Sequence, residues 1–140
     1  MSAEGTTVVV AGVIERGGWV LLSQRGPQGT HPGLWEFPGG KREPGERDQD
    51  SLAREILEEI GVEVAVGRLL WTERAGPLEL RFYSCAWPPA ARPRALAAVQ
   101  LRWVRAEDLP RYRFPPADAA FVAALAAGDR PIARRGGLWR

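Results

Sequence analysis

Residues 39–62 read GGKREPGERDQDSLAREILEEIGV, and this stretch is the most informative part of the chain. Its second half has apolar residues three and four positions apart, which is the spacing of one helix face. The pattern predicts a helix over residues 48–60 that ends at Gly61, because glycine commonly ends helices. At about 100° per residue, one arc of this helix is apolar and is expected to face the core. The residues of that arc are Leu52, Ala53, Ile56, Leu57 and Ile60.

Three glutamates, Glu55, Glu58 and Glu59, share a second arc of the same helix, because positions three and four apart stack on one face. Like charges at this spacing destabilise a helix by roughly a few tenths of a kcal/mol per pair, so a cation is expected beside them. Carboxylate oxygens in this number suit Mg²⁺ or Mn²⁺. The alternative is an acidic helix face in contact with water, and the helix alone leaves both open.

The segment before the helix favours the cation site. Gly39 and Gly40 carry no side chains, so their backbone amides and carbonyls can approach a ligand closely. Glu46 follows Gly40 by six residues. The loop between them can therefore bring one more carboxylate and one backbone carbonyl to the same ion.

The composition is typical of a soluble globular domain. The chain has 140 residues, of which 45% are hydrophobic and 26% charged. We expect one domain over residues 1–140, with a core over about 5–127 and a basic tail over 128–140. No apolar run reaches the ~20 residues that span a membrane, and the N-terminus has no secretory signal. The single cysteine, Cys85, excludes an internal disulfide, and the net charge of +2 does not predict nucleic-acid binding. A cytoplasmic location is the expectation.

Hydrophobic patterning predicts a mixture of strands and two main helices. Strands are expected over residues 6–14, 19–23, 62–72, 78–87 and 101–104. An alanine-rich helix is expected over residues 118–127, and residues 24–34 are expected to form a long loop. This order of elements predicts an α/β sandwich.

The residues from Gly40 to Val62 also match a known motif at every fixed position. The motif is G-x5-E-x7-R-E-U-x-E-E-x-G-U, the box of the Nudix hydrolases, in which U is aliphatic. Its fixed positions are Gly40, Glu46, Arg54, Glu55, Glu58, Glu59 and Gly61, with Ile56 and Val62 as the aliphatic residues. The chain therefore resembles this family. Residues 35–41 (WEFPGGK) and 114–118 (FPPAD) are similar to segments of the MutT-type enzymes within it.

The resemblance implies a fold and an activity. The fold would be an α/β/α sandwich with a mixed β-sheet. The activity would be Mg²⁺-dependent hydrolysis of nucleoside triphosphates to nucleoside monophosphate and pyrophosphate, with Mn²⁺ as a substitute ion. The nucleotide would be an oxidised one such as 8-oxo-dGTP, in sanitation of the nucleotide pool, or a cytosine nucleotide. The implied partner is this substrate, with no membrane or nucleic acid, and the protein would be a monomer or a homodimer.

Carried over by position, the resemblance assigns the metal ligands to Glu55, Glu58, Glu59 and the carbonyl of Gly39. Glu46 would bind a further ion directly or through water, and Arg54 would orient a glutamate by an ion pair. These five charged residues form the expected catalytic set. Many family members carry another acid before the strand expected at residues 101–104. This chain has no Asp or Glu between residues 79 and 107, which favours the box as the source of the catalytic carboxylates.

Five further residues are candidates for substrate binding. Arg25 and Lys41 would contact phosphate. Trp35 and Phe37 point to the same side of an extended segment, where they would line a base pocket or pack in the core. Asp118 would read the base, cap the following helix, or do both. An ionised carboxylate only accepts hydrogen bonds, so reading by Asp118 would favour guanine or cytosine over adenine.

Two alternative functions remain open at this level. Pro77 lies 16 residues after Gly61, a spacing seen in ADP-ribose pyrophosphatases of this family, so an ADP-ribose or nucleotide-sugar pyrophosphatase is one. The other reading of Pro77 is a hairpin turn between two strands. The second alternative is a non-catalytic base-binding module. Such modules usually lose box glutamates, and this chain keeps all of them.

Overall fold

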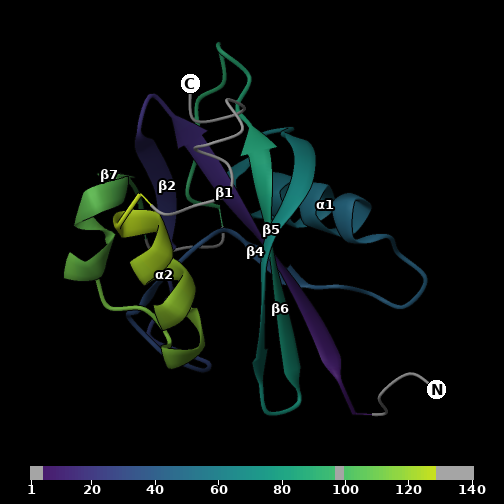
Figure 1. Cartoon of the computed structure of the whole chain (residues 1–140). Coiled ribbons are helices and arrows are strands. Elements are labelled where there is room, and N and C mark those ends of the chain that lie inside the picture. Colours follow the sequence, from purple (N-terminus) through teal and green to yellow (C-terminus); the bar gives the residue numbers. More distant parts are fainter. Residues whose placement is uncertain (1–4, 97–99, 129–140) are drawn as a thin grey trace.

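The computed structural model describes residues 5–96 and 100–128 (Figure 1). The predicted basic tail lies outside these residues from position 129 onward. The elements in chain order are β1 (Thr7–Arg16), β2 (Trp19–Gln24), β3 (Trp35–Glu36), β4 (Gly39–Lys41), α1 (Asp48–Ile60), β5 (Ala65–Ala75), β6 (Leu78–Ala86), β7 (Gln100–Arg105), the 3₁₀ helices η1 (Ala106–Arg111) and η2 (Pro116–Asp118), and α2 (Ala119–Ala126).

Strand β1 lies at the centre of the sheet. It pairs in parallel with β6 along most of its length and antiparallel with β4 and β2. The described strands follow the order β3-β2-β1-β6-β5, with β4 added on β1 and β7 on β2. One parallel pair among antiparallel pairs makes the sheet mixed, as predicted.

Helices cover both faces of this sheet, with α1 on one side of the strands and α2 on the other (Figure 1). Successive residues of a strand point to opposite faces, and β1 follows this rule. Val10 and Ile14 pack in the cluster that contains α1, whereas Ala11 and Val13 pack in the cluster that contains α2. The two clusters and the sheet between them confirm the predicted α/β/α sandwich.

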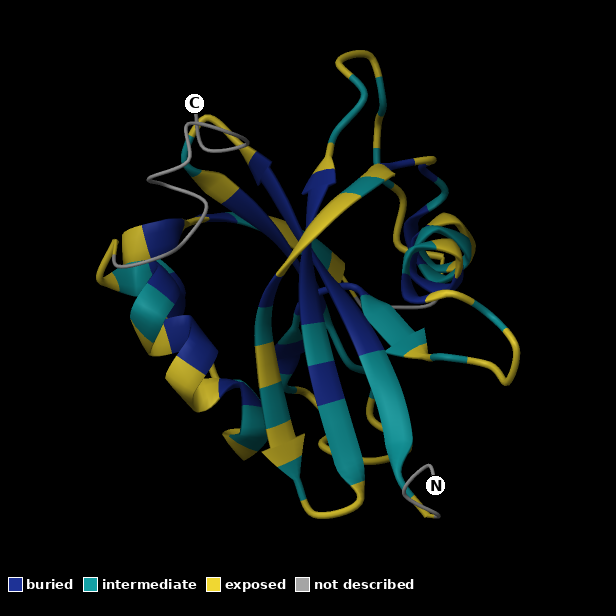
Figure 2. Cartoon of the chain, turned by 45° about the vertical axis from the view of Figure 1, so that its right-hand side comes forward, coloured by how far each residue is buried: buried dark blue, intermediate teal, exposed yellow. Residues whose placement is uncertain are grey.

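Helix α1 has the predicted bounds, but its buried face is rotated from the predicted one. Leu52, Ile56 and Ile60 are buried, as expected, whereas Leu57 is 43% exposed and its predicted core position is wrong. Asp48 and Ser51 are buried in its place. Figure 2 shows the buried side of α1 turned toward the strands. This rotation brings Glu55 and Glu59, which border the buried stripe, against the protein rather than into water.

Several boundaries differ from the sequence prediction. Strand β5 begins at Ala65 rather than residue 62, and β3 and β4 lie in a region with no predicted strand. The 3₁₀ helices η1 and η2 were not predicted either. Pro77 lies in the turn between β5 and β6, where its carbonyl accepts a hydrogen bond from the amide of Thr7 at 2.8 Å, which fits the hairpin reading. Within the described ranges, no helix has the length and apolar character needed to cross a membrane.

Candidate active site

The box glutamates of α1 lie against the backbone of β4. The Gly39 amide donates a hydrogen bond to Oε1 of Glu59 at 3.4 Å. A Cβ at Gly40 would stand 2.5 Å from the Glu55 carboxyl group, and one at Gly39 would stand 2.0 Å from the carbonyl oxygen of Val10. Only glycine fits at Gly39, because β4 lies closely against the backbone of β1, whereas a side chain at Gly40 would have to displace the Glu55 carboxyl group. The two glycines and the glutamates therefore form one cradle.

Arg54 holds three carboxylates of this region together. Its Nε and Nη2 contact the two oxygens of Glu46 at 2.9 and 3.0 Å, an arrangement that matches the planar guanidinium. Its Nη1 contacts Glu55 at 3.3 Å and Glu58 at 3.4 Å. The hydrogen bonds from Arg54 lower the pKa of Glu46 to about 2. These contacts suit the orienting role predicted for Arg54, which stays a prediction.

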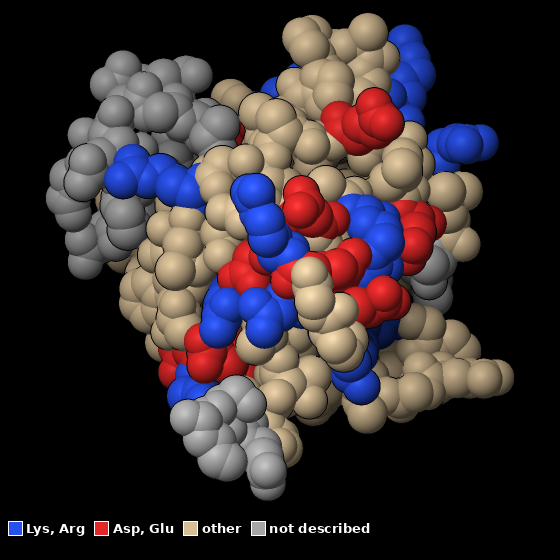
Figure 3. All heavy atoms as spheres, turned by 90° about the vertical axis from the view of Figure 1, so that its right-hand side faces the viewer, with Lys and Arg blue, Asp and Glu red and all other residues tan. Residues whose placement is uncertain are grey.

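The glutamates differ in their electrostatic surroundings. Burial raises the pKa of Glu59 to about 8, and the negative charges of Glu36 and Glu55 add to this effect. Burial also raises the pKa of Glu55. The side chain of Glu58 is 58% exposed. Acidic and basic side chains are interleaved on the face of the molecule that carries α1 (Figure 3). A cation beside Glu55 and Glu59 would favour their ionised forms.

The donor set of the cradle fits a divalent metal ion in its chemistry. Carboxylates and a backbone carbonyl offer only oxygen atoms, the donors that Mg²⁺ and Mn²⁺ prefer. Within residues 5–96 and 100–128, no three acidic, histidine or cysteine side chains stand close enough to hold an ion as they are. The glutamate side chains would therefore have to turn on α1 to share one.

A cavity of about 580 Å³ opens beside the cradle. It is lined by Gly39, Gly40 and Glu59 of the cradle and by four of the five predicted substrate-binding residues, which are Arg25, Phe37, Lys41 and Asp118. Its apolar wall comes from β1, β5 and β6, including Val9, Ala75, Leu78 and Leu80. The structure thus brings predicted metal ligands and predicted substrate contacts to one hollow.

Asp118 contributes a buried carboxyl group to this cavity. Its side chain is only 5% exposed. It occupies the position before α2 but makes no capping hydrogen bond, so the helix-cap reading of Asp118 is wrong. Burial, with a smaller contribution from the charge of Glu36, raises its pKa to about 7, although Arg25 acts in the opposite direction. A buried carboxyl group that does not cap the helix is available to bind a ligand.

Two ionisable side chains that line the cavity, Glu36 and His31, were not among the predicted site residues. Arg25 Nη1 pairs with Glu36 at 2.7 Å, and its Nη2 contacts the Thr30 hydroxyl at 3.1 Å. Burial raises the pKa of Glu36, and Arg25 opposes that effect. The one sequence signal for Glu36 is its place between two aromatic residues. His31 has a positive φ of 52°, uncommon for a residue with a side chain.

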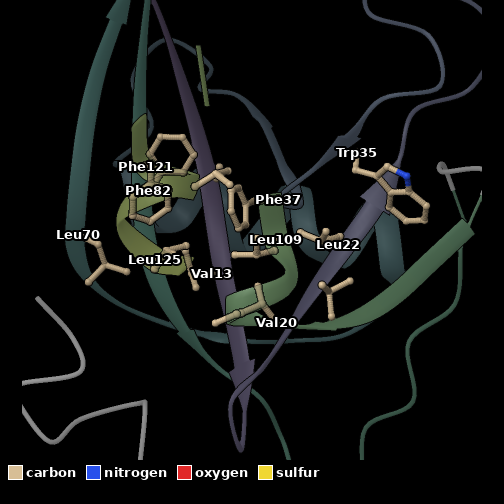
Figure 4. Packing of buried hydrophobic residues seen from close by; sticks show 14 of the residues in the cluster. Val13, Val20, Leu22, Trp35, Phe37, Leu70, Phe82, Leu109, Phe121 and Leu125 are labelled. Atoms are coloured by element: carbon tan, nitrogen blue, oxygen red, sulfur yellow. The ribbon is translucent and has the colours of Figure 1, made fainter. Parts of the chain in front are cut away.

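The aromatic candidates Trp35 and Phe37 have different surroundings. Phe37 lines the cavity and also packs in the core, stacked on Phe114 with ring centroids 5.5 Å apart. Trp35 is 8% exposed and packs edge-to-face on Tyr112. It is absent from the described residues that line the cavity, so the core reading applies to Trp35. Figure 4 shows Phe37 in the middle of the buried cluster and Trp35 at its edge.

The chain is similar to known proteins over most of its length. The family model described as "NUDIX domain" matches residues 9–124. The CTP pyrophosphohydrolase of Escherichia coli (strain K12) is 37% identical over 122 residues, which is 85% of this chain and 90% of that protein. A Mycobacterium tuberculosis (strain H37Rv) protein with the provisional name 8-oxo-dGTP diphosphatase 2 is 41% identical over 124 residues, or 85% of this chain and 87% of that protein.

A solved structure from work on MutT of Aliivibrio salmonicida and Vibrio cholerae superimposes with a TM-score of 0.78 at 31% identity. The superposition covers 88% of this chain and 98% of that one. The family match includes most of strand β1, the glycine and glutamate cradle, and every described residue that lines the cavity. With most of the chain inside that match, the protein belongs to the Nudix family.

Proposed function

We propose that this Nudix protein hydrolyses nucleoside triphosphates to nucleoside monophosphate and pyrophosphate. The observation that carries the proposal is that Glu59 and Gly39 line the same cavity as Arg25, Lys41 and Asp118. Such a cavity offers one place for a polyphosphate beside the carboxylates and for a base beside a buried acid. The names of the relatives, a CTP pyrophosphohydrolase and an 8-oxo-dGTP diphosphatase, support the same substrate class.

Nudix hydrolases generally need a divalent metal ion, and we propose Mg²⁺ for this chain, with Mn²⁺ as a substitute. Glu55, Glu58, Glu59 and the Gly39 carbonyl would hold it. The bound ion would neutralise charge on the phosphate oxygens and lower the pKa of a water molecule. Arg54 keeps the neighbouring carboxylates in place through its contacts with Glu46, Glu55 and Glu58.

The remaining residues of the cavity bind and orient the substrate. Lys41 is exposed and lines the cavity, and no ion pair joins it to another residue in the described part of the chain, so its ammonium group can contact phosphate. Arg25 is fixed by Glu36 and Thr30, which limits the freedom of its guanidinium before substrate arrives. Phe37 and the apolar wall pack against the base, and Asp118 forms hydrogen bonds with its edge. Much of the catalysis then comes from positioning and charge neutralisation.

A hydrolysis panel tests this function. CTP, GTP, ATP, 8-oxo-dGTP and ADP-ribose are incubated with the protein and Mg²⁺, and the products are separated by chromatography. We expect monophosphate and pyrophosphate from at least one triphosphate, at a kcat/KM above that for ADP-ribose, and no turnover when EDTA replaces Mg²⁺. Preferred cleavage of ADP-ribose, or binding without turnover of any compound, would overturn the proposal.

A further inference from the structure

A second polar cluster surrounds Asp48, the first residue of α1. Asp48 is 8% exposed, yet its carboxylate accepts hydrogen bonds from three side chains. Arg42 Nη1 approaches it at 2.8 Å, Arg81 Nη1 at 2.9 and 3.1 Å, and the Tyr83 hydroxyl donates to it as well. Burial opposes ionisation of Asp48, but these hydrogen bonds outweigh it and lower its pKa. A charged carboxylate is thus fixed at the start of the helix.

The partners of Asp48 lie on different elements. Arg81 and Tyr83 belong to β6, so they fasten α1 to the sheet. Arg42 directly follows β4, and its own amide donates to the carbonyl of Val8 in β1 at 2.9 Å. The pair of Arg42 and Asp48 therefore joins the end of β4 to the beginning of α1, across the base of the loop between them.

These are the two elements that form the cradle. Strand β4 contributes Gly39 and Gly40, and α1 contributes the glutamates that lie against them. A helix is stiff along its axis, so fixing its first residue also limits how Glu55, about 10 Å further along, can shift. The hydrogen bonds of Asp48 can thus control the distance between the carboxylates of α1 and the backbone of Gly39 and Gly40.

We propose that Arg42 is a positioning residue, which through Asp48 holds α1 at the distance from β4 that the metal ion requires. This inference rests on the proposed function, because it takes the cradle as the metal site. Arg42 touches none of the cradle glutamates through a contact found in the described residues; it acts through Asp48.

The direction of the effect separates positioning from simple electrostatics. Arg42 follows Gly40 by two residues, so Arg42→Gln removes a positive charge from the neighbourhood of the site. Coulomb's law alone predicts that a cation then binds more tightly. Loss of the ion pair between Arg42 and Asp48 predicts weaker binding, because the carboxylates of α1 are then no longer held at a fixed distance from β4. Asp48 keeps Arg81 and Tyr83 in this variant, so no buried charge is left unpaired.

The chain offers a matched control and a rescue. Arg74 belongs to the same series of ion pairs, since its Nη1 lies 3.4 Å from Glu79, which in turn pairs with Arg81. Arg74→Gln removes one arginine as well, but from β5, which does not join β4 to α1. Arg42→Lys keeps the charge and can replace the one Nη1 contact with Asp48.

The experiment titrates full-length protein with Mn²⁺ alone and measures free Mn²⁺ by electron paramagnetic resonance. Arg42→Gln should bind about tenfold or more weakly than wild type, a loss typical of residues that orient metal ligands. Arg74→Gln and Arg42→Lys should stay within about twofold. Equal or tighter binding by Arg42→Gln would overturn the proposal. So would loss of its circular dichroism spectrum, because Arg42 would then be holding the core rather than the cradle.

Hydrogen exchange provides a readout that does not depend on the metal. Peptides that cover residues 39–48 should exchange faster in Arg42→Gln than in Arg74→Gln or wild type. If wild type binds no Mn²⁺, the metal site of the proposed function fails. The exchange data then still decide whether Arg42 holds β4 to α1, and unchanged exchange in Arg42→Gln would contradict that tie.

Discussion

Replacing Asp118 by asparagine removes an ionisable group from the cavity with almost no change in shape. Asp118 is 5% exposed and makes no capping hydrogen bond, so the change does not cost α2 a cap. Asparagine cannot ionise and can both donate and accept hydrogen bonds. The variant therefore separates two properties of Asp118, the burial of its charge and its contact with the base.

The expected effect on stability follows from the pKa of Asp118. Burial raises this pKa from 3.8 to about 7. The unfolded chain releases the proton at lower pH than the folded protein, so wild type loses stability as the pH rises from 3.8 to about 7. The loss has an upper limit of about 4 kcal/mol, at about 1.4 kcal/mol per pKa unit. We expect about half of that, because water enters around an ionised carboxylate.

Urea unfolding at about pH 4 and about pH 8.5 measures this difference. Asp118→Asn should be more stable than wild type by about 2 kcal/mol at the higher pH, and the advantage should vanish at the lower pH. Asp50→Asn is the matched control, because it makes the same chemical change at a side chain that is 69% exposed. An Asp118→Asn protein that is no more stable than wild type at the higher pH would refute the reasoning from burial.

Nucleotide selectivity is the second readout of the same variant. If Asp118 contacts the base, the kcat/KM ratios among GTP, CTP and ATP should change by about tenfold, which corresponds to about 1.4 kcal/mol. At a pH above about 7, where Asp118 is ionised and only accepts hydrogen bonds, wild type should favour bases with exposed donors, and asparagine should weaken that preference. Unchanged ratios would show that Asp118 does not read the base.

Three further predictions concern the cradle. Glu58→Gln should abolish turnover without lowering the melting temperature, since its side chain is 58% exposed; near wild-type kcat with Mg²⁺ would contradict the ligand assignment. Gly40→Ala should fold, because the flexible end of Glu55 can move away from the new methyl group, but its kcat/KM should drop at least about tenfold. Activity equal to wild type would show that Glu55 need not lie against β4. Saturating Mg²⁺ should raise the melting temperature of wild type, because an ion that binds the folded protein stabilises it. The increase should be much smaller for Glu58→Gln. Equal shifts in the two proteins would place the ion elsewhere.

Local patterns in the sequence were enough to predict the bounds of helix α1. The bounds of α1 are as predicted, because the apolar spacing and Gly61 are both local signals. The position of Leu57 was wrong because hydrophobicity alone does not show how a helix is turned against a sheet. The rotation of α1 about its axis depends on where β4 lies, and β4 is held in place by β1, about 30 residues earlier in the chain.

Contacts between distant segments were beyond the sequence prediction. Asp48 meets Arg81 and Tyr83 only because the fold brings the first residue of α1 to these two side chains of β6. The pairing of Arg25 with Glu36 depends on the antiparallel contact of β2 with β3. The burial of Asp118 follows from the arrangement of α2 over the sheet, whereas its local sequence, two prolines followed by alanines, looks like an ordinary helix start.

Hydrolysis in ¹⁸O-labelled water tests the central claim most directly. The protein is incubated with Mg²⁺ and its best triphosphate from the panel, and the products of the first turnovers are analysed by mass spectrometry. The account predicts equal amounts of monophosphate and pyrophosphate, with one ¹⁸O atom in only one of the two products. Primary release of single phosphates, leaving a diphosphate or a nucleoside, would contradict it.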